Sequence, residues 1–288
     1  MHNSTLKSTL KIGQFNKLKV LKKTEFGYYL VDQEGHEILL PRKLTPDDIK
    51  LDQELDIFVC YDSEDRLMAT TEIPLVQVGQ FATLKIISVE NVGAFLDWGL
   101  SKDLFLPHGE QSRELRTGQD VLVYVYLDNT QRIAASMRLE KHLEKTPATY
   151  KVDEKVELLI IGKTDLGFKA IINGKHVGML FANEVFRPLY QGQKMDGFIK
   201  NIREDGKIDL SLALAGHKGS DDIAEKILAL LKKRGGFVSL TDKTPAEEIY
   251  DLFGVSKKKF KIALGGLYKK RLVVVEDKGI RLVISGTK

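Results

Sequence analysis

Three landmarks recur between residues 27 and 193 at the same two spacings, which indicates three copies of one structural unit. The first landmark is a glycine that precedes an apolar strand, at Gly27, Gly93 and Gly167. The second is the leucine that ends the next strand, at Leu40, Leu106 and Leu180. The third is a turn before a long strand, at Asp52-Gln53, Gly118-Gln119 and Gly192-Gln193. In every set the members are 66 and then 74 residues apart.

Each copy has the pattern of short alternating strands. In the second copy these strands are predicted at residues 81–87, 93–98, 104–106, 121–126 and 133–136. Five strands in about 65 residues cannot cover both faces of an open sandwich, whereas closure into a small barrel removes the edges and fills the interior with side chains. The predicted fold is therefore mainly β, with three tandem five-stranded barrels of the oligonucleotide-binding (OB) fold and a C-terminal α/β module. The predicted domains are residues 1–73, 74–149, 150–216 and 217–288.

The order of motifs in each copy resembles the RNA-binding domain first described in ribosomal protein S1. A strand with basic residues, (F/V)-G-x-(F/Y), an apolar strand, G-Q and D-x-x-x-R-(I/L) follow one another, most clearly in residues 74–149. Together with its tail, the whole chain resembles the conserved virulence factor B family of bacterial RNA-binding proteins. The resemblance implies a role in gene expression after transcription.

Strand alternation provides candidate RNA contacts that do not depend on this resemblance. Phe95 shares a strand face with Asp97, so its ring is expected on the polar side, where a single-stranded base can stack on it. Lys85 falls on the outward side of the preceding strand, and Lys19 lies 66 residues earlier in the same place. Both lysines are candidate phosphate contacts. The alternative for Phe95 is packing beneath a neighbouring loop or domain.

The resemblance also implies nucleic-acid contacts beside the glycine, at the end of the third strand and at the D-x-x-x-R motif. Carried over, they fall on Phe26, Tyr29, Asp62 and Arg66 in the first copy, on Phe95, Asp128 and Arg132 in the second, and on Lys169, Phe181, Arg203 and Lys207 in the third. The family's histidine at the end of the third strand is replaced by Pro41, Pro107 and Phe181. The pairs Asp62–Arg66 and Asp128–Arg132 are equally consistent with ion pairs that close a hairpin.

Charge favours the end of the chain as the main binding region. The first copy, counted over residues 10–73, holds 9 basic and 13 acidic residues, the second 8 and 9, and the third 10 and 9, whereas residues 217–288 hold 16 and 9. Neutralisation of phosphates supplies most non-specific affinity for nucleic acid. The third copy is the predicted partner of the tail, through Lys169, Lys194, Lys200, Arg203 and Lys207. The acidic first copy is predicted to be structural.

Residues 217–288 have the pattern of three helices and a terminal hairpin, which resembles a winged helix-turn-helix domain. Thr244-Pro245-Ala246-Glu247 predicts a capping box at the second helix. Ser256 is the predicted cap of the third helix, which opens with basic residues: Lys257, Lys258, Lys259 and Lys261. Lysines in a first turn oppose the helix dipole, and this is the pattern expected of a helix end that faces phosphates.

The sequence favours neither an enzyme nor a metal or cofactor site. Its six histidines lack metal-ligand or catalytic-dyad spacing, and it has no phosphate-binding Gly-Lys-Ser/Thr loop and no G-x-S-x-G motif. The one cysteine, Cys60, lies in an apolar run and is predicted to be a core residue. The absence of a long apolar run and of a secretory signal predicts a cytoplasmic protein with no membrane partner.

The sequence thus predicts a non-enzymatic RNA-binding protein that prefers single-stranded RNA. One alternative is a DNA-binding transcriptional regulator whose winged helix reads duplex DNA. Another is a scaffold whose barrels bind proteins instead of nucleic acid.

Overall fold

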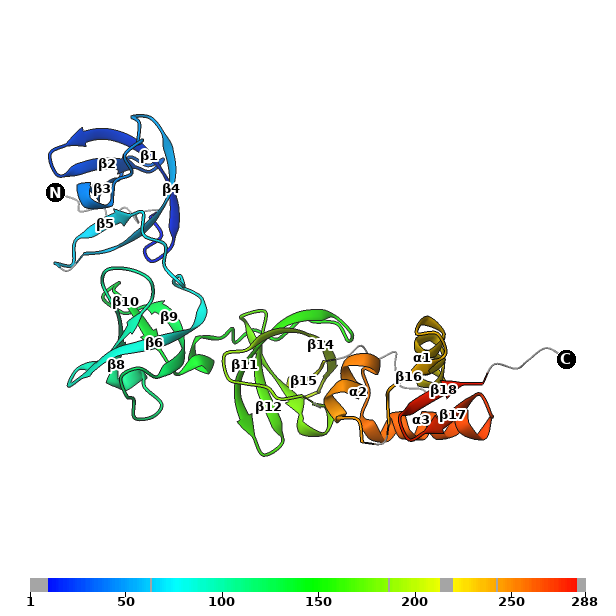
Figure 1. Ribbon diagram of the computed structural model, residues 1–288. Helices are drawn as coiled ribbons and strands as arrows, with labels where there is room; N and C mark the ends of the chain where they lie inside the picture. The colour runs from blue at the N-terminus through cyan, green and yellow to red at the C-terminus, as the bar shows by residue number, and fades with distance from the viewer. Residues whose placement is uncertain (1–9, 63, 186, 213–219, 242, 284–288) are drawn as a thin grey trace. The chain divides into compact units, whose positions relative to one another are not determined.

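The residues described by the computed structural model are 10–62, 64–185, 187–212, 220–241 and 243–283. The chain divides into two compact units between His142 and Leu143. The first unit contains two closed five-stranded barrels, and the second contains a third closed barrel and a helical module with a three-stranded sheet (Figure 1). This architecture confirms the predicted fold class.

The three barrels share one topology, in which the third strand runs parallel to the fifth, the other neighbours are antiparallel, and the fourth strand closes on the first. The strands of the first barrel are β1 (Phe15–Thr24), β2 (Gly27–Val31), β3 (Glu37–Pro41), β4 (Glu54–Tyr61) and β5 (Leu67–Thr70). Those of the second are β6 (Phe81–Glu90), β7 (Gly93–Asp97), β8 (Leu104–Pro107), β9 (Asp120–Leu127) and β10 (Ile133–Ser136). Those of the third are β11 (Lys155–Thr164), β12 (Gly167–Ile172), β13 (His176–Phe181), β14 (Lys194–Ile202) and β15 (Ile208–Ser211). Short 3-10 helices follow the third strand of each barrel and the end of the second barrel: η1 (Arg42–Leu44), η2 (His108–Glu110), η4 (Ala182–Glu184) and η3 (Leu139–His142).

The landmark glycines are required by a close approach of backbone. Gly27, Gly93 and Gly167 open the second strand of their barrels with φ of 144°, 155° and 152°. A Cβ atom at these positions would lie 2.1 Å, 2.4 Å and 2.0 Å from a carbonyl oxygen of the third strand. Any side chain would therefore push the two strands apart, which explains why all three copies have glycine at this point.

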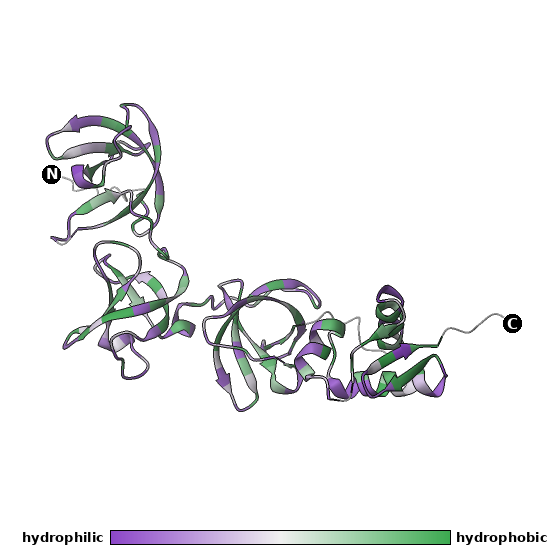
Figure 2. Ribbon diagram, viewed as in Figure 1, coloured by the Kyte–Doolittle hydropathy of each residue, from purple (hydrophilic) through white to green (hydrophobic). Residues whose placement is uncertain are grey.

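The strand β4 is buried on both faces, which accounts for its continuous apolar run. Polar and apolar residues alternate in the middle of strands such as β1 and β6 (Figure 2), as expected when one face is buried. In β4, however, Ile57 and Val59 fill the first barrel, while Phe58 and Cys60 join the hydrophobic cluster of the second. The ring of Phe58 meets Trp98 edge-on, with centroids 5.9 Å apart. One core cluster thus joins the two barrels of the first unit, and Cys60 is a core residue as predicted.

The helical module has the elements of a winged helix. They are α1 (Ser220–Lys233), β16 (Phe237–Val238), α2 (Ala246–Phe253), α3 (Lys257–Lys269), β17 (Val273–Glu276) and β18 (Gly279–Leu282), with the sheet order β16-β18-β17. The predicted cap of α3 is confirmed, because Ser256 Oγ accepts a hydrogen bond from the backbone N–H of Lys259 at 3.3 Å. The predicted capping box of α2 is wrong: the hydroxyl of Thr244 is turned back and accepts from the backbone N–H of Thr241 at 2.8 Å.

Across the described parts of the chain, no helix combines the length and the apolar character needed to cross a membrane.

Candidate nucleic-acid interface

The aromatic residue predicted to stack on bases, Phe95, lies on β7 outside the core of the second barrel. Its ring is half-buried and packs against Phe105 of β8, with ring centroids 5.3 Å apart and planes inclined by 39°. Both rings line a cavity of about 650 Å³ in the first unit, to which the first barrel contributes Pro41, Leu44 and Asp65. Phe95 is therefore neither a core residue nor fully open to solvent, because the first barrel forms part of the same cavity.

In the first barrel, the D-x-x-x-R motif closes the hairpin between β4 and β5. The carboxylate of Asp62 accepts hydrogen bonds from the backbone N–H groups of Glu64 and Arg66, at 2.8 and 2.9 Å, and from Arg66 Nε at 2.8 Å. Partial burial opposes ionisation of Asp62, but these hydrogen bonds and the charge of Arg66 outweigh it and lower the pKa of the carboxyl. The Arg66 guanidinium also pairs with Glu64 at 2.8 Å. Both charges of this motif are thus engaged locally.

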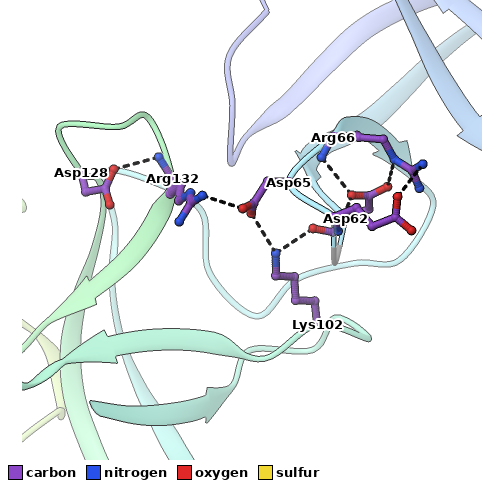
Figure 3. A network of polar contacts seen from close by, with 7 residues as sticks. Asp62, Asp65, Arg66, Lys102, Asp128 and Arg132 are labelled. Atoms are coloured by element: carbon purple, nitrogen blue, oxygen red, sulfur yellow. Dashed lines mark hydrogen bonds and ion pairs between the residues drawn. The ribbon is translucent and has the colours of Figure 1, made fainter. Parts of the chain in front are cut away.

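In the second barrel, the two members of the motif have separate partners. Asp128 closes the β9–β10 hairpin by accepting from the backbone N–H groups of Thr130 and Arg132, at 2.7 and 3.0 Å. The Arg132 side chain instead donates to the carboxylate of Asp65, on the β4–β5 hairpin of the first barrel, at 2.6 Å (Figure 3). The Nζ atom of Lys102 lies 3.6 Å from the same carboxylate. Asp65 thus lies between two cations, Arg132 and Lys102, and offsets their charge.

Sequence reasoning missed Asp65 and Lys102. Asp65 is 67 residues from Arg132 in the chain and occupies a variable position of the D-x-x-x-R motif, and Lys102 belongs to no recurring motif. The positive φ of Asp65, 59°, places it in a tight turn. The only local signal was the acidic composition of this hairpin, which does not indicate its partner.

The candidates on the outer face of the first two barrels also lie near acids. Lys19 pairs with Asp52 at 2.7 Å. Lys85 is exposed, but its cross-strand neighbours on β7 and β9 are Asp97 and Asp120.

The predicted aromatic pair of the first barrel differs in exposure. Phe26 is 65% exposed in the turn between β1 and β2. Tyr29 is half-buried, and the Nζ atom of Lys22 lies 4.9 Å from the centre of its ring. Lys22 is itself paired with Glu37 at 2.6 Å. Phe26 is therefore the more accessible of the two rings.

The basic residues of the third barrel are largely neutralised within it. Arg203 pairs with Asp209 at 2.9 Å, and its guanidinium lies 5.6 Å from the centre of the Phe181 ring. Lys207 pairs with Asp205 at 2.6 Å, and its hydrogen bond lowers the pKa of that carboxyl. The remaining candidates are three lysines. Lys200 pairs with Glu184. Lys169 is half-buried on β12, and Lys194 is exposed at the start of β14.

Helix α3 carries a different kind of basic surface. Lys258, Lys259 and Lys261 are exposed, and Lys257 is partly exposed. The other end of the helix adds Lys269, Lys270 and Arg271, all exposed. Among the residues with described positions, none of these seven cations forms an ion pair, whereas elsewhere in this module Arg281 pairs with Glu276. We call these seven residues the α3 basic surface.

A second feature that sequence spacing did not reveal is a small cluster in the first barrel. Ligand-type atoms of Asp32, Glu34 and His36 lie within 4.8 Å of one another in the β2–β3 turn. Asp32 accepts from the backbone N–H groups of Glu34 and His36, and its other oxygen lies 2.8 Å from His36 Nδ1. These contacts are sufficient to explain the cluster as part of the turn.

Comparison with known proteins agrees with this architecture. Residues 12–72 and 78–138 match the S1 domain, and residues 225–282 match the CvfB-like winged helix domain. The "Uncharacterized protein YitL" of Bacillus subtilis (strain 168) is 28% identical over 279 residues, which cover 93% of each chain. "Conserved virulence factor B" of Staphylococcus saprophyticus is 24% identical over 285 residues, which cover 96% of this chain and 95% of that protein. A crystal structure of a multidomain protein with nucleic acid binding domains from Streptococcus pneumoniae TIGR4 is 21% identical and covers 94% of this chain and 98% of that one, with a TM-score of 0.40.

The fold and the matched domains define a multidomain protein in which S1-type barrels precede a winged helix. The chain belongs to the conserved virulence factor B family.

Proposed function

We propose that this protein binds RNA, prefers single-stranded RNA, and regulates gene expression after transcription without catalysing a reaction. The observation that carries the proposal is the α3 basic surface. Seven cations lie on one helix and its end, and none of them has an acidic partner within the described part of the chain.

Free cations matter because of how phosphate is bound. A lysine that already pairs with a carboxylate must give up that partner before it can contact a phosphate. A lysine without such a partner exchanges only water and releases the counterions of the nucleic acid, which is the main source of non-specific affinity. Lys200, Arg203 and Lys207 are of the first kind, and the α3 basic surface is of the second. The tail is therefore the proposed source of most of the affinity.

The barrels have a secondary role in this proposal. Phe26, Phe95 and Phe181 present ring surface outside the barrel cores, and bases of single-stranded RNA stack on such rings. Arg66, Asp128 and Arg132 contribute less, because their hydrogen bonds and ion pairs hold the protein's own loops. Tyr29 also contributes less, because it is half-buried and its ring contacts Lys22. Lys19 and Lys85 sit beside carboxylates and contribute less.

The composition of α3 favours RNA backbone contact over sequence-specific reading of duplex DNA. Base pairs in the major groove are read mainly by Arg, Asn and Gln side chains. Helix α3 contains none of these, and its exposed polar residues are lysines and a tyrosine. A DNA-binding regulator remains the second candidate, because a winged helix is the motif that such regulators use.

The salt dependence of binding tests the proposal. A labelled single-stranded RNA and a DNA duplex are titrated with full-length protein from 50 to 300 mM salt. In a triple variant, Lys258→Gln, Lys259→Gln and Lys261→Gln, three phosphate contacts are removed. The slope of log affinity against log salt for RNA should fall by about 2, at about 0.7 per contact.

The matched control is Lys207→Gln in the third barrel, which removes a paired lysine and should leave the slope nearly unchanged. An unchanged slope in the triple variant would refute the assignment to α3. Tighter binding of the duplex than of RNA would favour the DNA-binding regulator, and no binding of either would favour a protein-interaction scaffold.

A further inference from the structure

We propose that the winged helix contains a pocket for one unpaired nucleobase, formed between α3 and the strand β17. This inference rests on the proposed binding of single-stranded RNA and assigns a base contact to the same surface. The pocket has a volume of about 340 Å³ and is lined by Lys261, Leu264, Gly265, Tyr268 and Val275, among others. This volume is at the lower end of the range for small-molecule sites, about 300–1,000 Å³, which suits a single flat group.

The first argument is the pair of glycines in the middle of α3. Gly265 and Gly266 have helical backbone conformations, and neither has the positive φ that would require glycine. A Cβ atom at either position would meet nothing within 4 Å. Glycine is, after proline, the least favourable residue in a helix interior. The fold therefore carries a cost at Gly265 that neither its backbone nor its packing explains, and the bare backbone there leaves room for a flat group to approach the helix.

The second argument is the exposure of Tyr268. Tyr268 is 57% exposed and lines the pocket. Residues three apart lie on the same face of a helix, and helical side chains lean toward the N-terminus. Tyr268 therefore extends over the turn that contains Gly265. A base that enters the pocket can stack on the phenol ring while its edge approaches the glycine backbone. Stacking on aromatic side chains is the usual way in which proteins hold single-stranded bases.

The third argument is the charge that surrounds the pocket. Lys261 lines it, and Lys258 lies one turn earlier on the same helix face. Both are exposed and belong to the α3 basic surface. Phosphates on either side of the stacked base can contact these lysines. A paired base in a duplex cannot enter such a pocket because its faces are already stacked, so the pocket confers a preference for single strands.

The test compares variants of the full-length protein with a short labelled single-stranded RNA and a duplex RNA of the same length. Tyr268→Ala should weaken single-strand binding about tenfold and leave duplex binding unchanged, whereas Tyr268→Phe should retain both. Gly265→Leu fills the pocket and should weaken single-strand binding by a similar factor. These results would support the pocket.

Gly265→Ala and its neighbour Gly266→Ala separate function from stability. Both should slow hydrogen exchange of the α3 amides, because alanine favours the helix. Only Gly265→Ala should also weaken single-strand binding, because Gly266 does not line the pocket. The pocket is refuted if Tyr268→Ala and Gly265→Leu bind single-stranded RNA like the unaltered protein while the α3 triple-lysine variant does not. If the unaltered protein binds no RNA, the proposed function fails, and the pocket fails with it.

Discussion

The substitution Gly93→Ala tests whether the landmark glycine is a requirement of the barrel. The new Cβ would lie 2.4 Å from the carbonyl oxygen of Leu106 and 2.7 Å from Cε2 of Phe105, both on β8. The backbone conformation, with φ of 155°, is also one that residues with side chains rarely adopt. Backbone strain of about 1–3 kcal/mol and overpacking of about 1–3 kcal/mol give an expected loss of about 2–6 kcal/mol in the free energy of unfolding.

The chain provides its own reporter for this measurement. Trp98 is the single tryptophan, is buried next to β7, and belongs to the cluster that joins the first two barrels. Its fluorescence during urea unfolding therefore follows the first unit alone. With a slope of about 1–3 kcal/mol per molar urea, Gly93→Ala should lower the midpoint by at least about 0.7 M.

Two control variants make the result specific. Gly109→Ala lies in the same barrel, where a Cβ meets nothing, and should leave the midpoint unchanged. Gly167→Ala makes the equivalent clash in the third barrel, which belongs to the other unit, so it should lower the circular dichroism transition without moving the Trp98 transition. A loss of less than about 1 kcal/mol in Gly93→Ala would show that the strands separate easily, and the explanation of the repeat would then be wrong.

Three further predictions concern ionisable groups of the first unit. Burial raises the pKa of the Cys60 thiol to about 12, so iodoacetamide at pH 8 should label it only after denaturation, as followed by mass spectrometry. The Asp65–Arg132 pair is exposed, so a double-mutant cycle with alanine, read by urea unfolding, should give a coupling below about 1 kcal/mol, and a much larger value would contradict this. Burial opposes ionisation of Glu110, but hydrogen bonds, first that of Lys141, lower its pKa below the usual 4.5. Its stabilising effect should therefore be complete above pH 4.5 and disappear as the pH falls through the lower folded value, so Glu110→Gln should flatten the acid unfolding curve in this range.

The barrels could be predicted from the sequence because their constraints are local. A glycine at the hairpin, an alternating strand and a turn each depend on a few consecutive residues, and the two spacings of 66 and 74 residues repeat them. The same holds for α3, where Ser256 before a helical pattern was sufficient to identify the cap. The capping box at Thr244 was misassigned because its hydroxyl has a competing local partner, the backbone N–H of Thr241.

The shared hydrophobic core of the first two barrels could not be predicted from the alternation of polar and apolar residues. In β4, Phe58 and Cys60 look like part of an ordinary buried strand, and only the structure shows that they belong to the core of a neighbour. The same applies to Arg132, whose motif suggested Asp128 as its partner. Its guanidinium pairs with Asp65 because the packing of β4 against the second barrel brings the β4–β5 hairpin within reach. Contacts between modules depend on surfaces that no single repeat encodes.

The net charge of a module does not by itself show how many of its cations are available to a phosphate. The third copy has one more basic than acidic residue, and the tail has seven more. The structure adds that the acids of the third barrel lie beside its cations, as Asp209 beside Arg203, whereas the α3 basic surface has no such acids within the described residues. A phosphate that approaches Arg203 must compete with a carboxylate at 2.9 Å, so the difference between the two modules in available charge is larger than their difference in net charge. It is the placement of the acids, more than the number of lysines, that makes α3 the stronger candidate for contact with RNA.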